Sequence, residues 1–123
     1  MLPNYFKSEL GLKNLNNFLL ISGPCVVESK SVVFKTCEKL KEITDKLKIP
    51  FVFKASYRKA NRTSGKSFSG INFDTAISIL ESVRSEFNVP VLTDVHSAFE
   101  AEILGDIVDI IQIPAFLCRQ TDI

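Results

Sequence analysis

The chain has 123 residues, a length that allows one domain. Lys and Arg number 15 against 14 Asp and Glu, so no global field favours nucleic acid or a membrane surface. Its apolar runs are too short to cross a bilayer, and no signal-peptide layout is present. We therefore expect a cytoplasmic protein that binds neither nucleic acid nor membrane and whose three cysteines stay reduced.

Four short apolar segments, each bounded by polar or turn residues, are predicted to be strands: 18–21, 51–53, 91–93 and 108–113. Their apolarity is largely continuous rather than alternating. This is expected of parallel strands that are buried on both faces.

Three helices are predicted between these strands. The first covers residues 30–47, and the second is opened by Asn72 as its N-cap. The third begins at Ser97, with Glu100 completing a capping box, and ends near Gly105. The chain is therefore α/β, with parallel strands alternating with helices and joined by right-handed crossovers.

Two architectures fit this alternation, an open doubly wound sheet and part of a closed barrel. Polar residues gather at or just after the predicted strand ends, which suits both folds and leaves them about even. The chain stops where another helix is expected, and a barrel of this kind needs roughly 250 residues. We therefore expect residues 1–123 to be a single incomplete domain, about the first four βα units of a barrel.

The loop after the second predicted strand is rich in cations. Lys54, Arg58, Lys59 and Arg62 are interleaved with hydroxyl and amide side chains. Such a loop can bind phosphates and carboxylates, although a solvated basic loop is the plainer alternative. Lys54 favours an anionic partner because it ends an apolar strand and would otherwise be partly desolvated.

Five segments together resemble the 3-deoxy-D-manno-octulosonate 8-phosphate synthase family, in the order and spacing of that family. They are Gly23-Pro24-Cys25 with Glu28-Ser29, Phe53-Lys54-Ala55-Ser56, Lys59-Ala60-Asn61-Arg62, Thr93-Asp94-Val95-His96, and the stretch from Gln112 to Asp122. The resemblance implies the N-terminal half of a (β/α)8 TIM barrel. It also implies an enzyme of lipopolysaccharide biosynthesis that condenses phosphoenolpyruvate with D-arabinose 5-phosphate. The chain alone is expected to be inactive.

Two other functions remain open. The related 3-deoxy-heptulosonate 7-phosphate synthase, which uses erythrose 4-phosphate, shares the Gly-Pro-Cys turn but looks different in the second loop. A truncated, non-catalytic half barrel that binds phosphorylated ligands is the alternative from another class.

The resemblance implies a role for each matching residue. Lys54, Ser56, Gln112 and Ala115 would hold phosphoenolpyruvate, and Lys59 would lie between the two substrates as a catalytic residue.

The sugar phosphate would contact a second group. Asn61, also implied to be catalytic, would bind its hydroxyls, Arg62 and Thr63 its phosphate, and Asp94 the sugar itself. Arg119 would reach the phosphate of a sugar bound in a neighbouring subunit, so a homo-oligomer is expected, a tetramer in this family.

Cys25 has two interpretations. A lone cysteine after a strand is more often a small buried hydrophobe. The family, however, carries cysteine here in metal-dependent members and asparagine in metal-independent ones. The resemblance thus implies a divalent metal, Zn, Fe or Mn, with its other ligands beyond residue 123. Cys37 is expected in the core, and Cys118 has no predicted chemical role.

His96, the only histidine, could be a base or a hydrogen-bonded structural residue, and we favour the second reading. Three residues depart from the family pattern. Arg58 replaces a usual acidic residue, Ser69 a common arginine, and Thr63 a serine whose hydroxyl it keeps.

Overall fold

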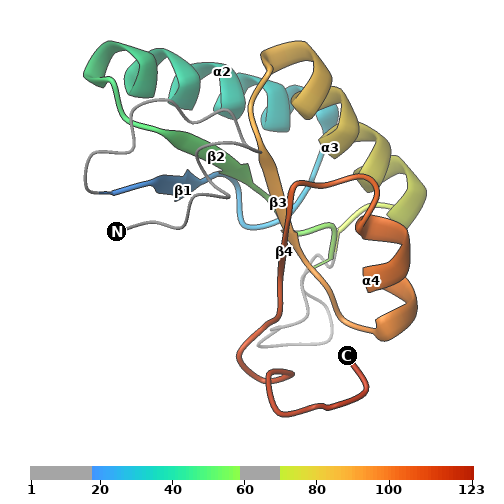
Figure 1. The fold of residues 1–123 in the computed structure, drawn as a ribbon. Helices are drawn as coiled ribbons and strands as arrows, with labels where there is room; N and C mark the ends of the chain where they lie inside the picture. Colours follow the sequence, from blue (N-terminus) through green and yellow to red (C-terminus); the bar gives the residue numbers. More distant parts are fainter. Residues whose placement is uncertain (1–17, 59–69) are drawn as a thin grey trace.

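The computed structural model describes residues 18–58 and 70–123 (Figure 1). Strands and helices alternate as predicted. In chain order they are β1 (Leu20–Ser22), α2 (Lys30–Leu47), β2 (Phe51–Lys54), α3 (Phe73–Phe87), β3 (Val91–Asp94), α4 (Ala98–Leu104) and β4 (Ile110–Gln112). None of the helices within these residues is long and apolar enough to cross a membrane.

Two strands are shorter than predicted. The first begins only at Leu20, whose N–H donates to the Pro50 carbonyl, while Phe18 is more than half exposed. The last begins at Ile110 rather than at residue 108. The reason is that the Val108 N–H still donates to Leu104 in the turn that leaves α4.

The sheet confirms the partial (β/α) barrel that the family resemblance implied and that the residue pattern alone left even with a doubly wound sheet. All neighbouring strands are parallel, and their order is β1-β2-β3-β4, the same as in the chain. A doubly wound sheet would reverse its strand order at a switch point. Here the three helices lie on one side of the sheet (Figure 1). The fold is therefore that of four consecutive strands of a (β/α) barrel.

The main hydrophobic core lies between the sheet and the helices. Phe34 of α2 and Phe87 of α3 meet edge to face, with ring centroids 5.2 Å apart. Cys37 is fully buried, as predicted, and burial raises the pKa of its thiol to about 12. The buried side chains of this core include Val27, Val33, Phe51, Phe53, Tyr57, Ala76, Ile77, Leu80, Val83, Val91, Val95 and Leu104.

A polar side chain caps the start of each helix, at Asn72 and Ser97 as predicted and at Ser29 in addition. Ser29 accepts a hydrogen bond from the Val32 N–H, and Asn72 accepts from the N–H groups of Asp74 and Thr75. Such N-caps satisfy backbone donors that lack a partner in the first helical turn.

A carboxylate fixes β4 against β3. Asp109 Oδ2 accepts from the Val91 N–H at 2.9 Å, and its Oδ1 lies 2.9 Å from Arg84 Nη2 of α3. The Asp109 N–H in turn donates to the Val91 carbonyl. One side chain thus joins two strands and a helix.

Gly23 lies in the turn after β1, at the point where this turn crosses the end of β2. A Cβ atom at this position would lie 1.9 Å from the Lys54 carbonyl oxygen, much closer than any real Cβ contact. Glycine is therefore required here for close backbone approach rather than for an unusual dihedral angle.

We predict that Gly23→Ala destabilises the protein by about 1–3 kcal/mol, because the new methyl group must displace backbone. Gly105→Ala is the matched control. Gly105 has right-handed helical dihedrals, and its added Cβ would meet only ordinary contacts from 3.4 Å. Chemical denaturation of both variants measures the difference. Equal free energies of unfolding for the two variants would contradict the argument.

Candidate functional site

Three predicted site residues end three successive strands. Lys54 is the last residue of β2, Asp94 of β3 and Gln112 of β4. In the ladder Lys54 is paired with Leu92 and Asp94 with Gln112. Because side chains alternate between the two faces of a strand, Lys54, Asp94 and Gln112 lie on the same face.

The helices do not cover this face. Phe53 and Val91 of the neighbouring register pair belong to the core under the helices, so the side chains one residue further along point the other way. In a closed barrel this second face is the interior, and the carboxyl ends of the strands carry the site. The structure therefore brings together three of the predicted residues at the location where barrels place their chemistry.

The loops after β1 and β2 run side by side and bring two more predicted residues together. Val26 and Ser56 form a parallel bridge, the Val27 N–H donates to the Ser56 carbonyl, and the Ser56 N–H donates to the Cys25 carbonyl. Ser56 is buried, whereas Cys25 is exposed. The exposed Cys25 thiol does not match the reading of this residue as a buried hydrophobe.

The remaining predicted residues fall into two sets. Ala115 and Arg119 are exposed in the turns that follow β4. The others lie outside the described residues, as does the departure at Ser69; they are Lys59, Asn61, Arg62 and Thr63.

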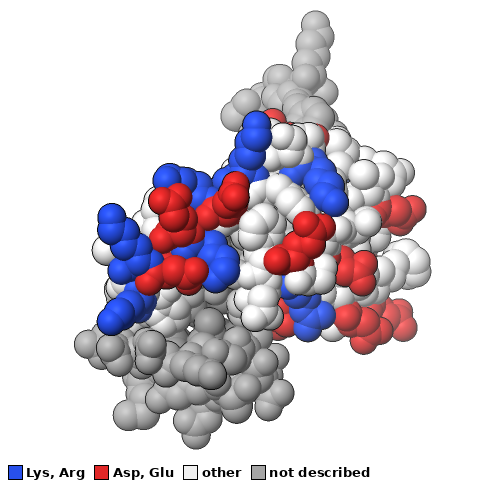
Figure 2. All heavy atoms as spheres, turned by 90° about the horizontal axis from the view of Figure 1, so that it is seen from above, with Lys and Arg blue, Asp and Glu red and all other residues white. Residues whose placement is uncertain are grey.

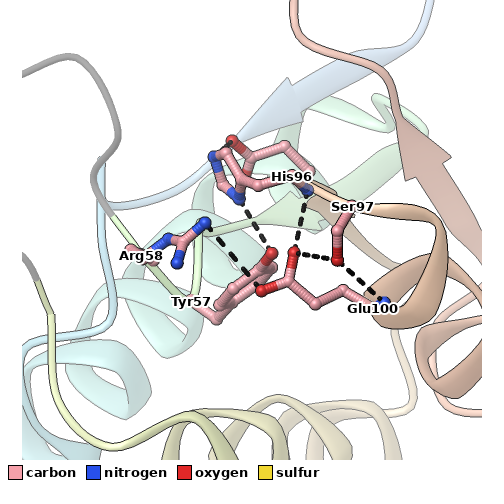
Figure 3. Close-up of polar contacts among 6 residues, drawn as sticks. Tyr57, Arg58, His96, Ser97 and Glu100 are labelled. Atoms are coloured by element: carbon pink, nitrogen blue, oxygen red, sulfur yellow. Dashed lines mark hydrogen bonds and ion pairs between the residues drawn. The ribbon is translucent and has the colours of Figure 1, made fainter. Parts of the chain in front are cut away.

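A buried polar cluster adjoins Asp94 (Figure 3). The Tyr57 hydroxyl lies 2.8 Å from His96 Nδ1, and Tyr57 is only 2% exposed. The other ring nitrogen, Nε2, lies 3.4 Å from Asp94 Oδ2. Tyr57 also packs edge to face on Phe73, with centroids 4.9 Å apart. The hydrogen-bonded, structural reading of His96 agrees with these contacts.

Glu100 joins this cluster to the start of α4. Its Oε2 accepts from the His96 N–H at 3.2 Å and from the Ser97 hydroxyl at 3.0 Å, and Ser97 Oγ accepts from the Glu100 N–H (Figure 3). The predicted capping box is therefore confirmed, except that the carboxylate reaches the N–H one residue before the cap.

Arg58 lies at the rim of the cluster. Its Nη2 is 3.9 Å from Glu100 Oε1, and the Arg58 side chain is 52% exposed. An ion pair this long and this exposed contributes little stability. The departure at Arg58 thus adds a positive charge beside Glu100 without a tight contact.

Proton affinities within the cluster are shifted by its packing. Burial, followed by hydrogen bonding to Glu100 and the Glu100 charge, raises the pKa of Tyr57. Burial alone would raise the pKa of Glu100. The hydroxyls of Tyr57 and Ser97, the Arg58 charge and the His96 N–H outweigh it and lower this pKa below 4.5. The phenol is therefore protonated and the carboxylate ionised at neutral pH.

Three buried polar atoms have no hydrogen-bond partner in the described part of the chain. They are Thr93 Oγ1, Asp94 Oδ1 and His96 Nε2. Buried polar atoms are rarely left unpaired in native proteins. A free acceptor on Asp94 beside a ring nitrogen of His96 is an arrangement that a ligand hydroxyl could satisfy.

Charged side chains of both signs occur on the face seen from above, and positive and negative groups alternate at the left of this view (Figure 2). Helix α2 contributes the pairs Lys39–Glu42 and Lys41–Asp45, at 2.6 and 2.9 Å. An anion site of the kind that the sequence predicts would therefore depend on local groups such as Lys54.

Metal ligands are too few for a complete centre within residues 18–58 and 70–123. No group of three His, Cys, Asp or Glu side chains comes together there. A zinc site usually has three or four protein ligands, of which Cys25 would supply one.

Sequence reasoning missed Tyr57 and the link from Glu100 to His96. Tyr57 and His96 are 39 residues apart. They meet only because the loops after β2 and β3 are neighbours, which no local pattern shows.

The sequential order of parallel strands places the chain in the class of (β/α)-barrel proteins, which carry their functional groups at the carboxyl ends of the strands. Within this class, residues 12–123 match the model of the DAHP synthetase I family. The chain belongs to this family.

Its similarity to named relatives extends over most of its length. It is 53% identical over 114 residues to the 2-dehydro-3-deoxyphosphooctonate aldolase of Bordetella petrii. It is 54% identical over 114 residues to the proteins of the same name from Burkholderia cenocepacia and Paraburkholderia phymatum. Each comparison covers 93% of this chain but 39% of the relative. The chain thus spans about two fifths of the length of the curated relatives it matches.

We predict that Glu100→Gln changes how stability depends on pH. Folding lowers the pKa of Glu100. The ionised carboxylate therefore adds to the free energy of unfolding above pH 4.5, and this stabilisation is lost as the pH falls through the pKa of Glu100 in the folded protein. The variant should be less stable than wild type by about 1–2 kcal/mol at neutral pH, and the gap should close in acid. Denaturation at several pH values measures this gap. Exposed Glu102→Gln, on the same helix, is the control. A gap independent of pH would refute the assignment.

Proposed function

We propose that the protein containing this chain condenses phosphoenolpyruvate with D-arabinose 5-phosphate and water to give 3-deoxy-D-manno-octulosonate 8-phosphate and phosphate. The observation that carries the proposal is the identity of 53–54% to relatives named 2-dehydro-3-deoxyphosphooctonate aldolase. The product would serve lipopolysaccharide biosynthesis in the cytoplasm.

The geometry of the described residues supports this chemistry. Lys54 can pair with an anionic group at the end of β2, and Gln112 can donate and accept at the end of β4. Between them Asp94 offers an unpaired acceptor that suits a sugar hydroxyl. Ammonium, amide and carboxylate groups on one face match a pair of substrates that carry phosphate, carboxylate and hydroxyl groups.

The proposed reaction forms one carbon–carbon bond. C3 of phosphoenolpyruvate attacks the aldehyde carbon of the sugar, water adds at C2, and inorganic phosphate leaves from C2. The two substrates repel each other because both are anions. The contribution of Lys54 and its neighbours is to hold both substrates in reacting positions and to stabilise charge as it develops.

The predicted roles of single residues stay part of the proposal. Lys54, Ser56, Gln112 and Ala115 would hold phosphoenolpyruvate, and Lys59 would lie between the substrates. Asn61, Arg62, Thr63 and Asp94 would bind the sugar phosphate. Arg119 is exposed, which is compatible with reaching a sugar in a neighbouring subunit of a homo-oligomer.

The four strands would form the first half of the complete barrel. In the described chain β1 and β4 are the sheet edges, and apolar side chains near them, Ile21 and Ile113, are 44% and 49% exposed. Further strands would cover such groups. Cys25 would be one ligand of a divalent metal, Zn, Fe or Mn, whose other ligands lie outside the described residues.

Substrate choice tests the proposal. Protein made from the complete reading frame should release phosphate from phosphoenolpyruvate with arabinose 5-phosphate and far less with erythrose 4-phosphate. The 123 residues alone should show no turnover. Preference for erythrose 4-phosphate would favour the heptulosonate synthase, and binding without turnover by the complete protein would favour a non-catalytic role.

Cys25 gives a second test. Chelation should abolish activity, and added metal should restore it, because a thiolate binds Zn²⁺ or Fe²⁺ far better than a hydroxyl does. Cys25→Ser should bind metal poorly, whereas Cys25→Asn should keep some activity that no longer responds to chelator. Exposed Cys118→Ser is the matched control and should behave as wild type. Full wild-type activity after exhaustive metal removal would contradict the proposal that Cys25 binds an essential metal.

A further inference from the structure

Tyr57 and His96 form a hydrogen-bonded pair to which the proposed reaction assigns no role. The Tyr57 hydroxyl lies 2.8 Å from His96 Nδ1, and the His96 side chain is only 4% exposed. His96 Nε2 faces Asp94 Oδ2 at 3.4 Å. The ring nitrogen of His96 that carries the proton therefore decides whether Asp94 faces an N–H donor or a lone pair.

The phenol has one proton and two neighbours that can accept it. If Tyr57 donates to His96 Nδ1, a neutral histidine must carry its own proton on Nε2. If Tyr57 instead donates to Glu100, His96 Nδ1 must carry a proton to donate to the phenol oxygen. A neutral ring would then turn the lone pair of Nε2 toward the Asp94 carboxylate. On a neutral ring, only donation by Tyr57 to Nδ1 therefore places an Nε2–H beside Asp94.

The position of that proton matters for Asp94 itself. His96 Nε2 lies 3.4 Å from Asp94 Oδ2. Neither Nε2 nor Asp94 Oδ1 has a hydrogen-bond partner among the described residues. Asp94 lies on the face that also carries Lys54 and Gln112. An Nε2–H and the unpaired Oδ1 would together offer a ligand hydroxyl on this face one donor and one acceptor.

We propose that Tyr57 is a positioning residue. Its hydroxyl donates to His96 Nδ1 and so keeps the ring proton on Nε2, where this N–H and the unpaired Asp94 Oδ1 can together bind a hydroxyl of a polyol substrate. The substrate part of this inference rests on the proposed function, whereas the proton part does not.

The test uses Tyr57→Phe in the complete protein. This variant removes one oxygen and keeps the ring that packs on Phe73. Ser82→Ala is the control, because it removes a hydroxyl that bonds the Ser78 carbonyl within α3, away from the cluster. His96→Gln is the conservative variant of the partner, since its amide retains one donor.

Nitrogen-15 NMR of the histidine rings reads the proton directly. The His96 signals are assigned by their loss in His96→Gln. In wild type and in Ser82→Ala, Nε2 should carry a proton, and in Tyr57→Phe the signals should shift toward a mixture of the two neutral tautomers. Unchanged His96 signals in Tyr57→Phe would overturn the proposal, whatever the substrate proves to be.

Kinetics read the consequence for Asp94. Tyr57→Phe should raise the KM for arabinose 5-phosphate about two- to tenfold, the range expected for losing one neutral hydrogen bond, and leave the KM for phosphoenolpyruvate unchanged. Adding Tyr57→Phe to His96→Gln should cost nothing more, because Tyr57 acts through His96. Equal losses for both substrates, or additive effects, would mean that Tyr57 serves stability alone.

Failure of the two proposals can be told apart. If wild type does not turn over arabinose 5-phosphate, the proposed function fails, and the NMR comparison still decides the role of Tyr57. If wild type is active and Tyr57→Phe matches it in both KM values, the positioning role fails and the function stands.

Discussion

The backbone contact between Gly23 and Lys54 underlies the arrangement of the site. With no side chain at residue 23, the turn after β1 lies against the end of β2. The two loops then run together, and hydrogen bonds join Ser56 to Cys25 and to Val27. Strand pairing thus extends past the strands themselves. Cys25, Lys54 and Ser56 share one edge of the sheet because this contact brings their backbones together.

Local chemistry made much of the fold predictable. Helix α2 has the predicted bounds, and Asn72 and Ser97 are N-caps, because capping depends on residues within one turn. Strand order was not predictable from the apolar pattern. Buried parallel strands have the same continuous apolarity in a doubly wound sheet and in a barrel, so the pattern alone could not separate the two folds, whereas the family resemblance and the observed order do. Strand ends shifted because the Leu20 N–H pairs with the Pro50 carbonyl and the Val108 N–H still bonds to the Leu104 carbonyl, contacts that the apolarity of the segments does not show.

The candidate site also has a part that the sequence predicts and a part that depends on the fold. Lys54, Asp94 and Gln112 could be found because they end apolar strands, and alternation then places them on one face. The surroundings of Asp94 could not be found. Tyr57 comes from the loop after β2 and His96 from the loop after β3, so their contact depends on strand order. The unpaired oxygen of Asp94 likewise emerges only from the packing around it.

The three cysteines differ in a way that has a practical consequence. Cys37 is buried in the core with a pKa raised to about 12, whereas Cys25 and Cys118 are exposed. The thiolate is the nucleophile that attacks an alkylating reagent, so in the folded protein such a reagent should modify Cys25 and Cys118 and spare Cys37. Modification of Cys37 requires the core between α2 and the sheet to open. The rate at which Cys37 is modified therefore measures how often that part of the core opens.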